Sequence, residues 1–259
     1  MQKLFTTILV GAIFIGVSLR CVANQVNIAV ASNALAALKE ISAEFTKQTG
    51  HTVEISSGST GKLYAQIING APYDVFLAAD ESTPQKMEQA HLIVPNSRFT
   101  YALGKLVAWS DDASLLKSAD MKSILLSPSV TRIAIANPKT APYGLAAQQA
   151  MEKLGIWNSL QAKMIRGENV SQTFQFAASK NANIGFVAKS QIMNTIAQNK
   201  GSYQEVPAEL YEPIRQQAVW LLRALHNTAA KEFVIFMRND AAKSILMNQY
   251  GYGMEFGSK

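Results

Sequence analysis

Short apolar runs rich in β-branched residues alternate along the chain with longer segments whose apolar residues recur every three or four positions. The runs predict strands at residues 26–30, 53–55, 73–77, 99–103, 105–109, 132–136, 163–165, 184–187 and 219–222. The periodic segments predict helices at residues 35–50, 63–68, 84–89, 119–126, 144–154, 171–178, 190–198, 229–237 and 241–249. This alternation is typical of α/β proteins, whose parallel sheets carry helices on both faces.

Four of the predicted strand-to-helix turns contain small and hydrogen-bonding residues and no charge, at 31–33, 58–61, 141–144 and 169–171. In parallel sheets such turns gather at the carboxyl ends of the strands. A helix N-terminus presents unpaired backbone N–H groups and the positive end of the helix dipole, so several of them together predict an anion site. Two turns lie in the first third of the chain and two in the middle, which favours a cleft between two lobes.

Each turn also has a purely structural interpretation. Ser32 precedes an amphipathic helix, where a serine is a common N-cap. Next to Asn33, however, it offers a hydroxyl and an amide beside the backbone donors. The pair is suited to holding an oxyanion.

The second turn, Gly58-Ser59-Thr60-Gly61-Lys62, resembles a nucleotide P-loop at first sight. A P-loop needs a glycine five residues before the Gly-Lys pair and a serine or threonine after the lysine, but Ser56 and Leu63 stand at these positions. What remains is a glycine-containing loop that presents Ser59 and Thr60 at a helix start, or alternatively a well-capped surface helix.

The two later turns add one side-chain candidate and one backbone candidate. Proline and glycine help to fix the turn at 141–144, which places the phenol of Tyr143 on the rim of the cleft. The alternative for Tyr143 is simple packing. Val170 contributes only its backbone N–H, and its alternative role is that of a core residue.

The rest of the sequence offers little for catalysis or direct metal binding. His51, His91 and His226 lie far apart and in no metal-ligand spacing, and there is no Gly-x-Ser-x-Gly motif. Basic residues are scattered, so the net charge of +6 does not indicate nucleic-acid binding. We expect a non-enzymatic protein with no cofactor, no nucleic-acid partner and no metal ion ligated by side chains.

The N-terminal segment has the features of a secretory signal peptide. Lys3 is followed by an uncharged, mostly apolar run at 4–19, which is too short to span a membrane, and the small residues at 21 and 23 predict cleavage after Ala23. Lipid attachment at Cys21 is a minority alternative, because Arg20 before it is unfavourable for that processing. The mature chain would have no cysteine and a net charge of +4, and would rely on its core for stability.

With these residues in view, the chain resembles the periplasmic molybdate-binding proteins of ABC transporters over nearly all of its mature sequence. The motifs that carry the resemblance lie at 31–33, 58–67, 69–80, 133–138, 142–144, 154–157, 168–170 and 184–187. The stretch Gly-Ala-Pro-Tyr-Asp-Val-Phe within 69–80 is specific in company with the others.

The resemblance implies a type II periplasmic-binding-protein fold. This fold has two similar α/β lobes with central mixed, mostly parallel sheets, joined by two crossover strands. Here the first lobe would comprise residues 24–104 and 215–259, and the second lobe residues 105–214.

The resemblance also implies the oxyanion ligands. In the first lobe they fall on Ser32 with Asn33 and on Thr60, with Ser59 as the near alternative. In the second lobe they fall on Tyr143 and Val170. Many family members have a further tyrosine where this chain has Ala188. The phenol of Tyr143 is expected to replace it.

The function implied is that of a monomeric periplasmic receptor that closes around molybdate or tungstate and delivers it to an ABC permease in the inner membrane. Neutral donors suffice for a dianion, and a site made only of donors disfavours phosphate, whose proton would lack an acceptor. The alternative is an enzyme or sensory module on the same fold that acts on another small anion, because fold does not fix function.

Overall fold

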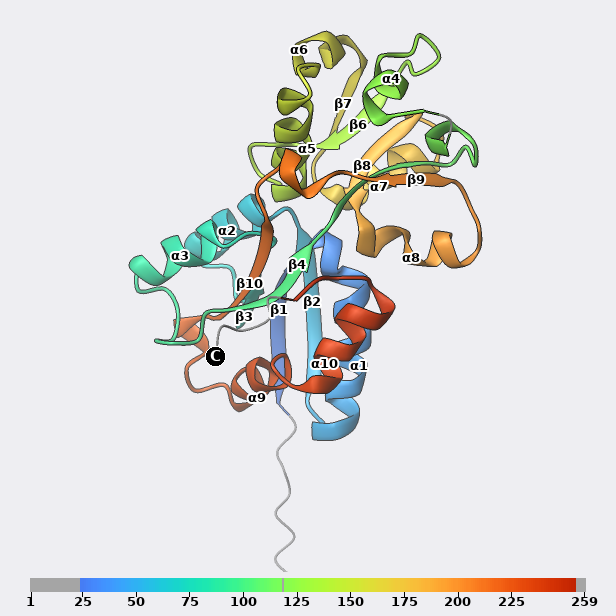
Figure 1. Ribbon diagram of the computed structural model, residues 1–259. Coiled ribbons are helices and arrows are strands. Elements are labelled where there is room, and N and C mark those ends of the chain that lie inside the picture. The colour runs from blue at the N-terminus through green and yellow to red at the C-terminus, as the bar shows by residue number, and fades with distance from the viewer. Residues whose placement is uncertain (1–23, 118, 255–259) are drawn as a thin grey trace, which may run out of the picture.

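The computed structural model describes residues 24–117 and 119–254. This part of the chain forms two five-stranded sheets, one in each half of the molecule (Figure 1). The predicted signal peptide lies outside the described residues. Within the described residues no helix is both long and apolar enough to cross a lipid bilayer.

The first sheet has the strand order β2-β1-β3-β10-β4. Its strands are β1 (Gln25–Ala31), β2 (Thr52–Gly58), β3 (Val75–Leu77), β4 (Phe99–Gly104) and β10 (Ile214–Trp220). The second sheet has the order β7-β6-β8-β5-β9. Its strands are β5 (Leu106–Ser110), β6 (Ile133–Ala136), β7 (Met164–Gly167), β8 (Ile184–Ala188) and β9 (Ser202–Glu205).

Both sheets are mixed and are built on the same plan. Three neighbouring strands run parallel, with Ile28 of β1 opposite Ile55 and Val75, and the other two pairings in each sheet are antiparallel. The carboxyl ends of the parallel strands therefore share one edge of each sheet. The predicted fold of two mixed α/β sheets is confirmed.

Helices cover both faces of the first sheet because successive side chains of a strand point to opposite faces. Ile28 packs with Phe45 and Phe233 on one face, whereas its neighbour Ala29 packs with Leu63 on the other. The first face carries α1 (Leu35–Thr49), α9 (Thr228–Phe236), α10 (Asp240–Ser244) and the π-helix η6 (Ile245–Gln249). The second face carries α2 (Thr60–Ile68) and α3 (Ser82–Gln89).

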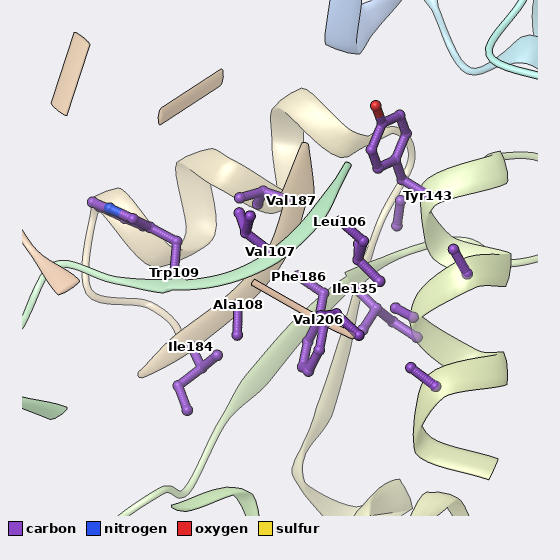
Figure 2. Close-up of a cluster of buried hydrophobic side chains, with 14 of the residues drawn as sticks. Leu106, Val107, Ala108, Trp109, Ile135, Tyr143, Ile184, Phe186, Val187 and Val206 are labelled. Atoms are coloured by element: carbon purple, nitrogen blue, oxygen red, sulfur yellow. The ribbon is translucent and has the colours of Figure 1, made fainter. Parts of the chain in front are cut away.

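The second sheet is also buried on both faces. Every residue of β5, β6 and β8 is buried, and several of their side chains form the cluster in Figure 2. Trp109 of β5 also packs against Phe174, with 5.0 Å between the ring centroids. The helices of this half are α4 (Met121–Leu126), α5 (Pro142–Lys153), α6 (Trp157–Leu160), α7 (Val170–Ala178) and α8 (Lys189–Ala197). Its 3₁₀ turns are η2 (Leu115–Lys117), η3 (Gln161–Lys163) and η4 (Ala208–Leu210).

The chain crosses between the two sheets twice. Only Lys105 separates the end of β4 in the first sheet from the start of β5 in the second. The return crossing follows β9 and leads into β10, whose Ile214 pairs with Gly104 of β4. The two crossings therefore lie side by side where the halves meet.

The strand predicted at 219–222 is shifted from the one found, which is β10. Residues 214–218 include Gln216 and Gln217, whose polar side chains break the apolar pattern although both are buried. The polar strand β9 and the short helix α6 were not predicted. The other predicted strands and helices are present with ends that differ by a few residues.

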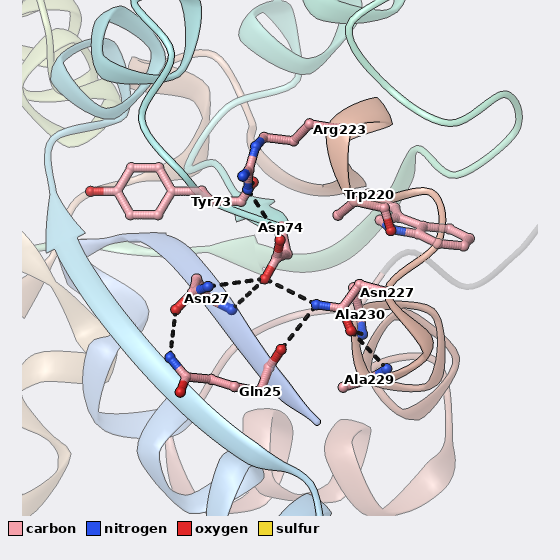
Figure 3. Close-up of polar contacts among 10 residues, drawn as sticks. Gln25, Asn27, Tyr73, Asp74, Trp220, Arg223, Asn227, Ala229 and Ala230 are labelled. Carbon is pink, nitrogen blue, oxygen red and sulfur yellow. Dashed lines mark hydrogen bonds and ion pairs between the residues drawn. The ribbon is translucent and has the colours of Figure 1, made fainter. Parts of the chain in front are cut away.

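A buried carboxylate ties the first sheet to the C-terminal part of the chain (Figure 3). Asp74 accepts hydrogen bonds from the backbone N–H of Asn27 at 2.8 Å and from its side-chain amide at 3.2 Å. It also accepts from Arg223 in η5 (Leu222–Ala224) at 3.2 Å and from Asn227 at 3.3 Å. A single side chain thus joins β1 to the segment that follows β10.

Replacing Asp74 by alanine tests this junction. We expect Asp74→Ala to lower the free energy of unfolding by about 2 kcal/mol, because the part-buried donors of Asn27 and Asn227 lose their buried acceptor. Urea denaturation followed by circular dichroism measures the change.

The control is Asp112→Ala, which removes an exposed carboxylate that accepts hydrogen bonds from the nearby Ser114. Its expected cost is below about 1 kcal/mol. Equal destabilisation by the two substitutions would contradict the importance of the Asp74 junction.

Candidate functional site

A small cavity lies where the strand-to-helix turns of the two halves meet. All six residues predicted as oxyanion ligands line it, and the other lining residues are small or proline. The full set is Ala31, Ser32, Asn33, Gly58, Ser59, Thr60, Ala79, Ala141, Pro142, Tyr143 and Val170. The cavity is small, with free space for about one water molecule in this conformation. None of these lining residues carries a charged side chain.

The turn after β1 forms a 3₁₀ helix, η1 (Ser32–Ala34), with Ala31 at its N-cap and no capping side chain. The capping role considered for Ser32 is therefore not observed. Asn33 is 3% exposed, and its side-chain amide donates to Gln216 Oε1 at 2.7 Å and to the Tyr252 hydroxyl at 3.0 Å. Both amide hydrogens of Asn33 are thus engaged within the protein.

The turn after β2 contains two hydroxyls in different situations. Ser59 is the N-cap residue of α2, yet its buried hydroxyl makes no capping bond and has no hydrogen-bond partner among the described residues. The hydroxyl of Thr60 accepts a hydrogen bond from the N–H of Ala79 at 3.0 Å. A buried hydroxyl without a partner is costly, so Ser59 is the more unusual of the two.

Tyr143 lies inside the protein, at 1% exposure, and not on the rim that the sequence suggested. Figure 2 shows its hydroxyl pointing away from the labelled apolar side chains of the core around the second sheet. The close start of α5 explains the position: a Cβ atom on Gly144 would lie 2.2 Å from the carbonyl oxygen of Ala136. Only glycine allows this helix to begin so close to the end of β6.

Burial also fixes the protonation state of this phenol. Loss of hydration raises the pKa of Tyr143 well above its ordinary value. The side chain therefore keeps its hydrogen at neutral pH and is able to donate a hydrogen bond.

Val170 occupies the first position of α7 and is 4% exposed. The side chain of Asn169 caps this helix by accepting from the N–H groups of Ser171 and Gln172. The cap does not use the N–H of Val170. Val170 itself lines the cavity, and the role of its N–H as a donor stays a prediction.

Direct hydrogen bonds join the two halves around the cavity. Ser171 Oγ donates to the carbonyl of Ser32 at 3.2 Å, and Ser190 Oγ donates to the carbonyl of Asn33 at 3.0 Å. On the other side, the N–H of Gly61 donates to the carbonyl of Thr140 at 2.9 Å. The turns of both halves are therefore in contact, and the cavity between them is closed.

A charged pair, Lys62 and Glu168, also spans the halves, but both side chains are more than half exposed. The pair lies outside the cavity. Charge is thus present around the site and not within its wall.

Sequence reasoning missed a group of buried polar residues beside the cavity. Gln216, Tyr101 and Tyr252 surround Asn33 and Tyr143 and bond to them or to one another. The signal in the sequence was a glutamine pair interrupting an apolar strand.

Within the described residues, no group of three or more histidine, cysteine, aspartate or glutamate side chains is arranged to hold a metal ion. The three histidines are likewise not among the residues that line the cavity. The cavity offers neutral hydrogen-bonding groups, namely hydroxyls, the N–H groups of helix starts and the side-chain carbonyl of Asn33, which is buried without a partner among the described residues.

Comparison with known proteins places this architecture in a family. A model of bacterial extracellular solute-binding proteins matches residues 26–253. The chain is 45% identical to the molybdate-binding protein ModA of Azotobacter vinelandii over 90% of this chain and 91% of that protein. It is 44% identical to the molybdate-binding protein ModA of Rhodobacter capsulatus over 94% of each.

A solved structure agrees with these sequence relatives. The periplasmic molybdate-binding protein of Azotobacter vinelandii superposes with a TM-score of 0.84 and 41% identity, covering 88% of this chain and 99% of that one. These are binding proteins and not enzymes, in agreement with the lack of catalytic motifs. The chain therefore belongs to the bacterial extracellular solute-binding proteins and, among them, to the family of the molybdate-binding protein ModA.

Proposed function

We propose that this protein binds molybdate, and also tungstate, in the cavity between its two halves and delivers it to an ABC permease in the inner membrane. The observation that carries the proposal is an uncharged cavity, formed by four strand-to-helix turns, in a chain whose relatives are molybdate-binding proteins. The proposed location is the periplasm, after cleavage of the signal peptide near Ala23, and the proposed state is a monomer.

The proposed ligands are those predicted from the sequence. Ser32 and Asn33 supply donors from the first turn, Ser59 and Thr60 from the second, and Tyr143 and Val170 from the other half. Ser59 has an unpartnered hydroxyl, and Thr60 accepts from the N–H of Ala79 and so keeps its own hydroxyl hydrogen, which supports both as side-chain donors. The engaged amide of Asn33 favours its backbone N–H as the group that faces the ligand.

Selectivity follows from the donor character of the proposed ligands. A tetrahedral dianion carries only acceptors, so hydroxyl and N–H groups can replace its hydration shell, and helix dipoles add favourable potential. Hydrogen phosphate would bring a buried O–H that needs an acceptor, at a cost of about 1–3 kcal/mol. Sulfate must be excluded by the size of the closed cavity.

Closure of two lobes is the proposed binding motion. We assign residues 24–104 and 215–259 to one lobe and residues 105–214 to the other. The hydrogen bonds of Ser171, Ser190 and Gly61 across the cavity support a closed form that these contacts stabilise. Opening would break them and expose the turns to solvent.

Calorimetric titration tests the ligand assignment. We expect sodium molybdate and sodium tungstate to bind the mature protein with dissociation constants of micromolar or tighter, and phosphate not to bind at the same concentrations. Molybdate at 100 times its dissociation constant should also stabilise the protein by about 2.7 kcal/mol, seen as a higher melting temperature. Absence of heat with both metal oxyanions would reject the assignment.

The substitution Ser59→Ala tests the role of the unpartnered hydroxyl, because it predicts opposite effects on stability and binding. Removing a buried hydroxyl without a partner should raise the unfolding free energy of the ligand-free protein by about 1 kcal/mol. Losing a donor to a charged ligand should weaken molybdate binding by about tenfold. Urea denaturation and calorimetry measure the two effects.

Ser42→Ala is the matched control. Ser42 is a second buried serine whose hydroxyl has no partner among the described residues, but it lies on α1 and not at the cavity. It should gain stability without any change in molybdate affinity. The role proposed for Ser59 would be wrong if both variants bound molybdate like the unmodified protein.

A further inference from the structure

We propose that Gln216 is a positioning residue that directs the hydroxyl hydrogen of Tyr143 toward the bound oxyanion, in a space that Gly104 keeps open. Neither Gln216 nor Gly104 was predicted from the sequence, and neither lines the cavity. The inference rests on the proposed function. It adds that Gly104 of β4 and Gln216 of β10 hold the hydroxyl of Tyr143, one of the proposed ligand groups, in place.

The direction of the hydrogen bond between Gln216 and Tyr143 is the first argument. The side-chain carbonyl of Gln216 accepts from Asn33 Nδ2 at 2.7 Å and from the Tyr101 hydroxyl at 3.0 Å. The Asn33 amide holds the carbonyl on one side, and the Tyr101 hydroxyl, whose single hydrogen is shared with the carbonyl of Ala78 at 3.2 Å, supports it. The amide nitrogen therefore faces Tyr143 and donates to its hydroxyl oxygen at 3.3 Å. A phenol that receives this bond keeps its own hydrogen for another acceptor.

The opposite orientation of the amide would have the opposite result. If the carbonyl of Gln216 faced Tyr143, the phenol would donate to it and would have no hydrogen left for a ligand. The bonds from Asn33 and Tyr101 disfavour that orientation. Gln216 therefore determines whether Tyr143 acts as a donor toward the cavity.

Space at the crossing of the two halves is the second argument. A Cβ atom on Gly104 would lie 2.3 Å from the hydroxyl oxygen of Tyr143 and 2.9 Å from the amide nitrogen of Gln216. Such distances are far inside van der Waals contact. Only a glycine at the end of β4 leaves room for the Tyr143–Gln216 pair.

The local shape of β10 provides the third argument. The register of β10 against β4 shifts between Gln216 and Gln217, a bulge of the kind that redirects a side chain. Gln216 is fully buried and reaches Asn33 in one half of the molecule and Tyr143 in the other. The Asn33 bond thus serves to orient the Gln216 amide, and the Tyr143 bond passes that orientation to the phenol.

A thermodynamic double-mutant cycle on molybdate affinity tests the proposal. The variants are Tyr143→Phe, Gln216→Met and the combination, titrated calorimetrically with sodium molybdate. Each single variant should bind about tenfold more weakly, the loss expected for one hydrogen bond to a charged group. Because Gln216 acts through the phenol, the combined variant should bind within about twofold of Tyr143→Phe alone.

Two results would overturn the proposal. One is unchanged affinity in Gln216→Met. The other is multiplied losses, about a hundredfold in the combined variant, which would mean that Gln216 acts through the general structure and not through Tyr143. If the unmodified protein does not bind molybdate at all, the proposed function itself fails, so the two failures are distinguishable.

Gln217→Met is the matched control for losing a buried glutamine. Gln217 bonds to Thr100 at 3.2 Å and accepts from Arg98 at 2.9 Å, away from Tyr143. It should lose stability in a thermal melt and keep molybdate affinity within about twofold. A tenfold loss of affinity in this control would contradict a specific role for Gln216.

Gly104→Ala probes the same pair independently if Gln216→Met does not fold. Its methyl group should displace the phenol and weaken molybdate binding by about tenfold. The loss should shrink to about twofold when Tyr143 is already phenylalanine, since the hydroxyl in closest conflict is gone. Equal losses in both backgrounds would contradict the proposal.

Discussion

The gathering of uncharged hydrogen-bonding groups from four strand-to-helix turns in one buried place is the constraint from which the proposed site follows. The ends of β1, β2, β6 and β7 bring hydroxyl groups and helix starts to one cavity whose lining residues carry no charge. Ser59 is the clearest case of a lining group that lacks a partner, because its hydroxyl is buried and bonds to nothing among the described residues. A ligand composed of acceptors can accept a hydrogen bond from this hydroxyl, whereas a cation would be repelled by the positive N-terminal ends of the helices.

The topology makes that concentration of donors possible. Each sheet presents three parallel strands whose carboxyl ends face the other half, so turns far apart in sequence become neighbours. Close backbone approaches then complete the arrangement. Gly61 donates to Thr140 across the halves, and Gly144 lets α5 start directly at the end of β6. Small residues at these turns are thus required by geometry as well as by the absence of charge.

The sequence predicted the fold and the residues of the cavity well where the signal was periodic or local. Four uncharged turns identified all six lining candidates, because small polar residues between a strand and a helix form a signal within a few consecutive positions. Prediction failed where a strand contains polar residues in place of apolar ones. The start of β10 was missed because Gln216 and Gln217 are polar, and β9 was missed because Ser202–Glu205 has little apolar character.

The choice between neighbouring groups also lay beyond the sequence. Whether Ser59 or Thr60 has the free hydroxyl depends on the N–H of Ala79, which only the folded chain brings near. Similarly, Tyr143 lies inside and not on the rim because Gly104, on a strand of the other sheet, leaves space for it. Such contacts join residues that are distant along the chain, and local patterns do not record them.

The junction at Asp74 has a consequence for how the chain reaches its native state. The second sheet is built from one continuous stretch, whereas the first must wait for β10 and the segment carrying Arg223 and Asn227, which are synthesised after the whole second sheet. Long-range pairing is slow, so the continuous half is able to assemble early while the interrupted half remains incomplete. Completion of the first half is thus coupled to synthesis of nearly the whole chain, and a truncation before β10 would leave its sheet without an interior strand.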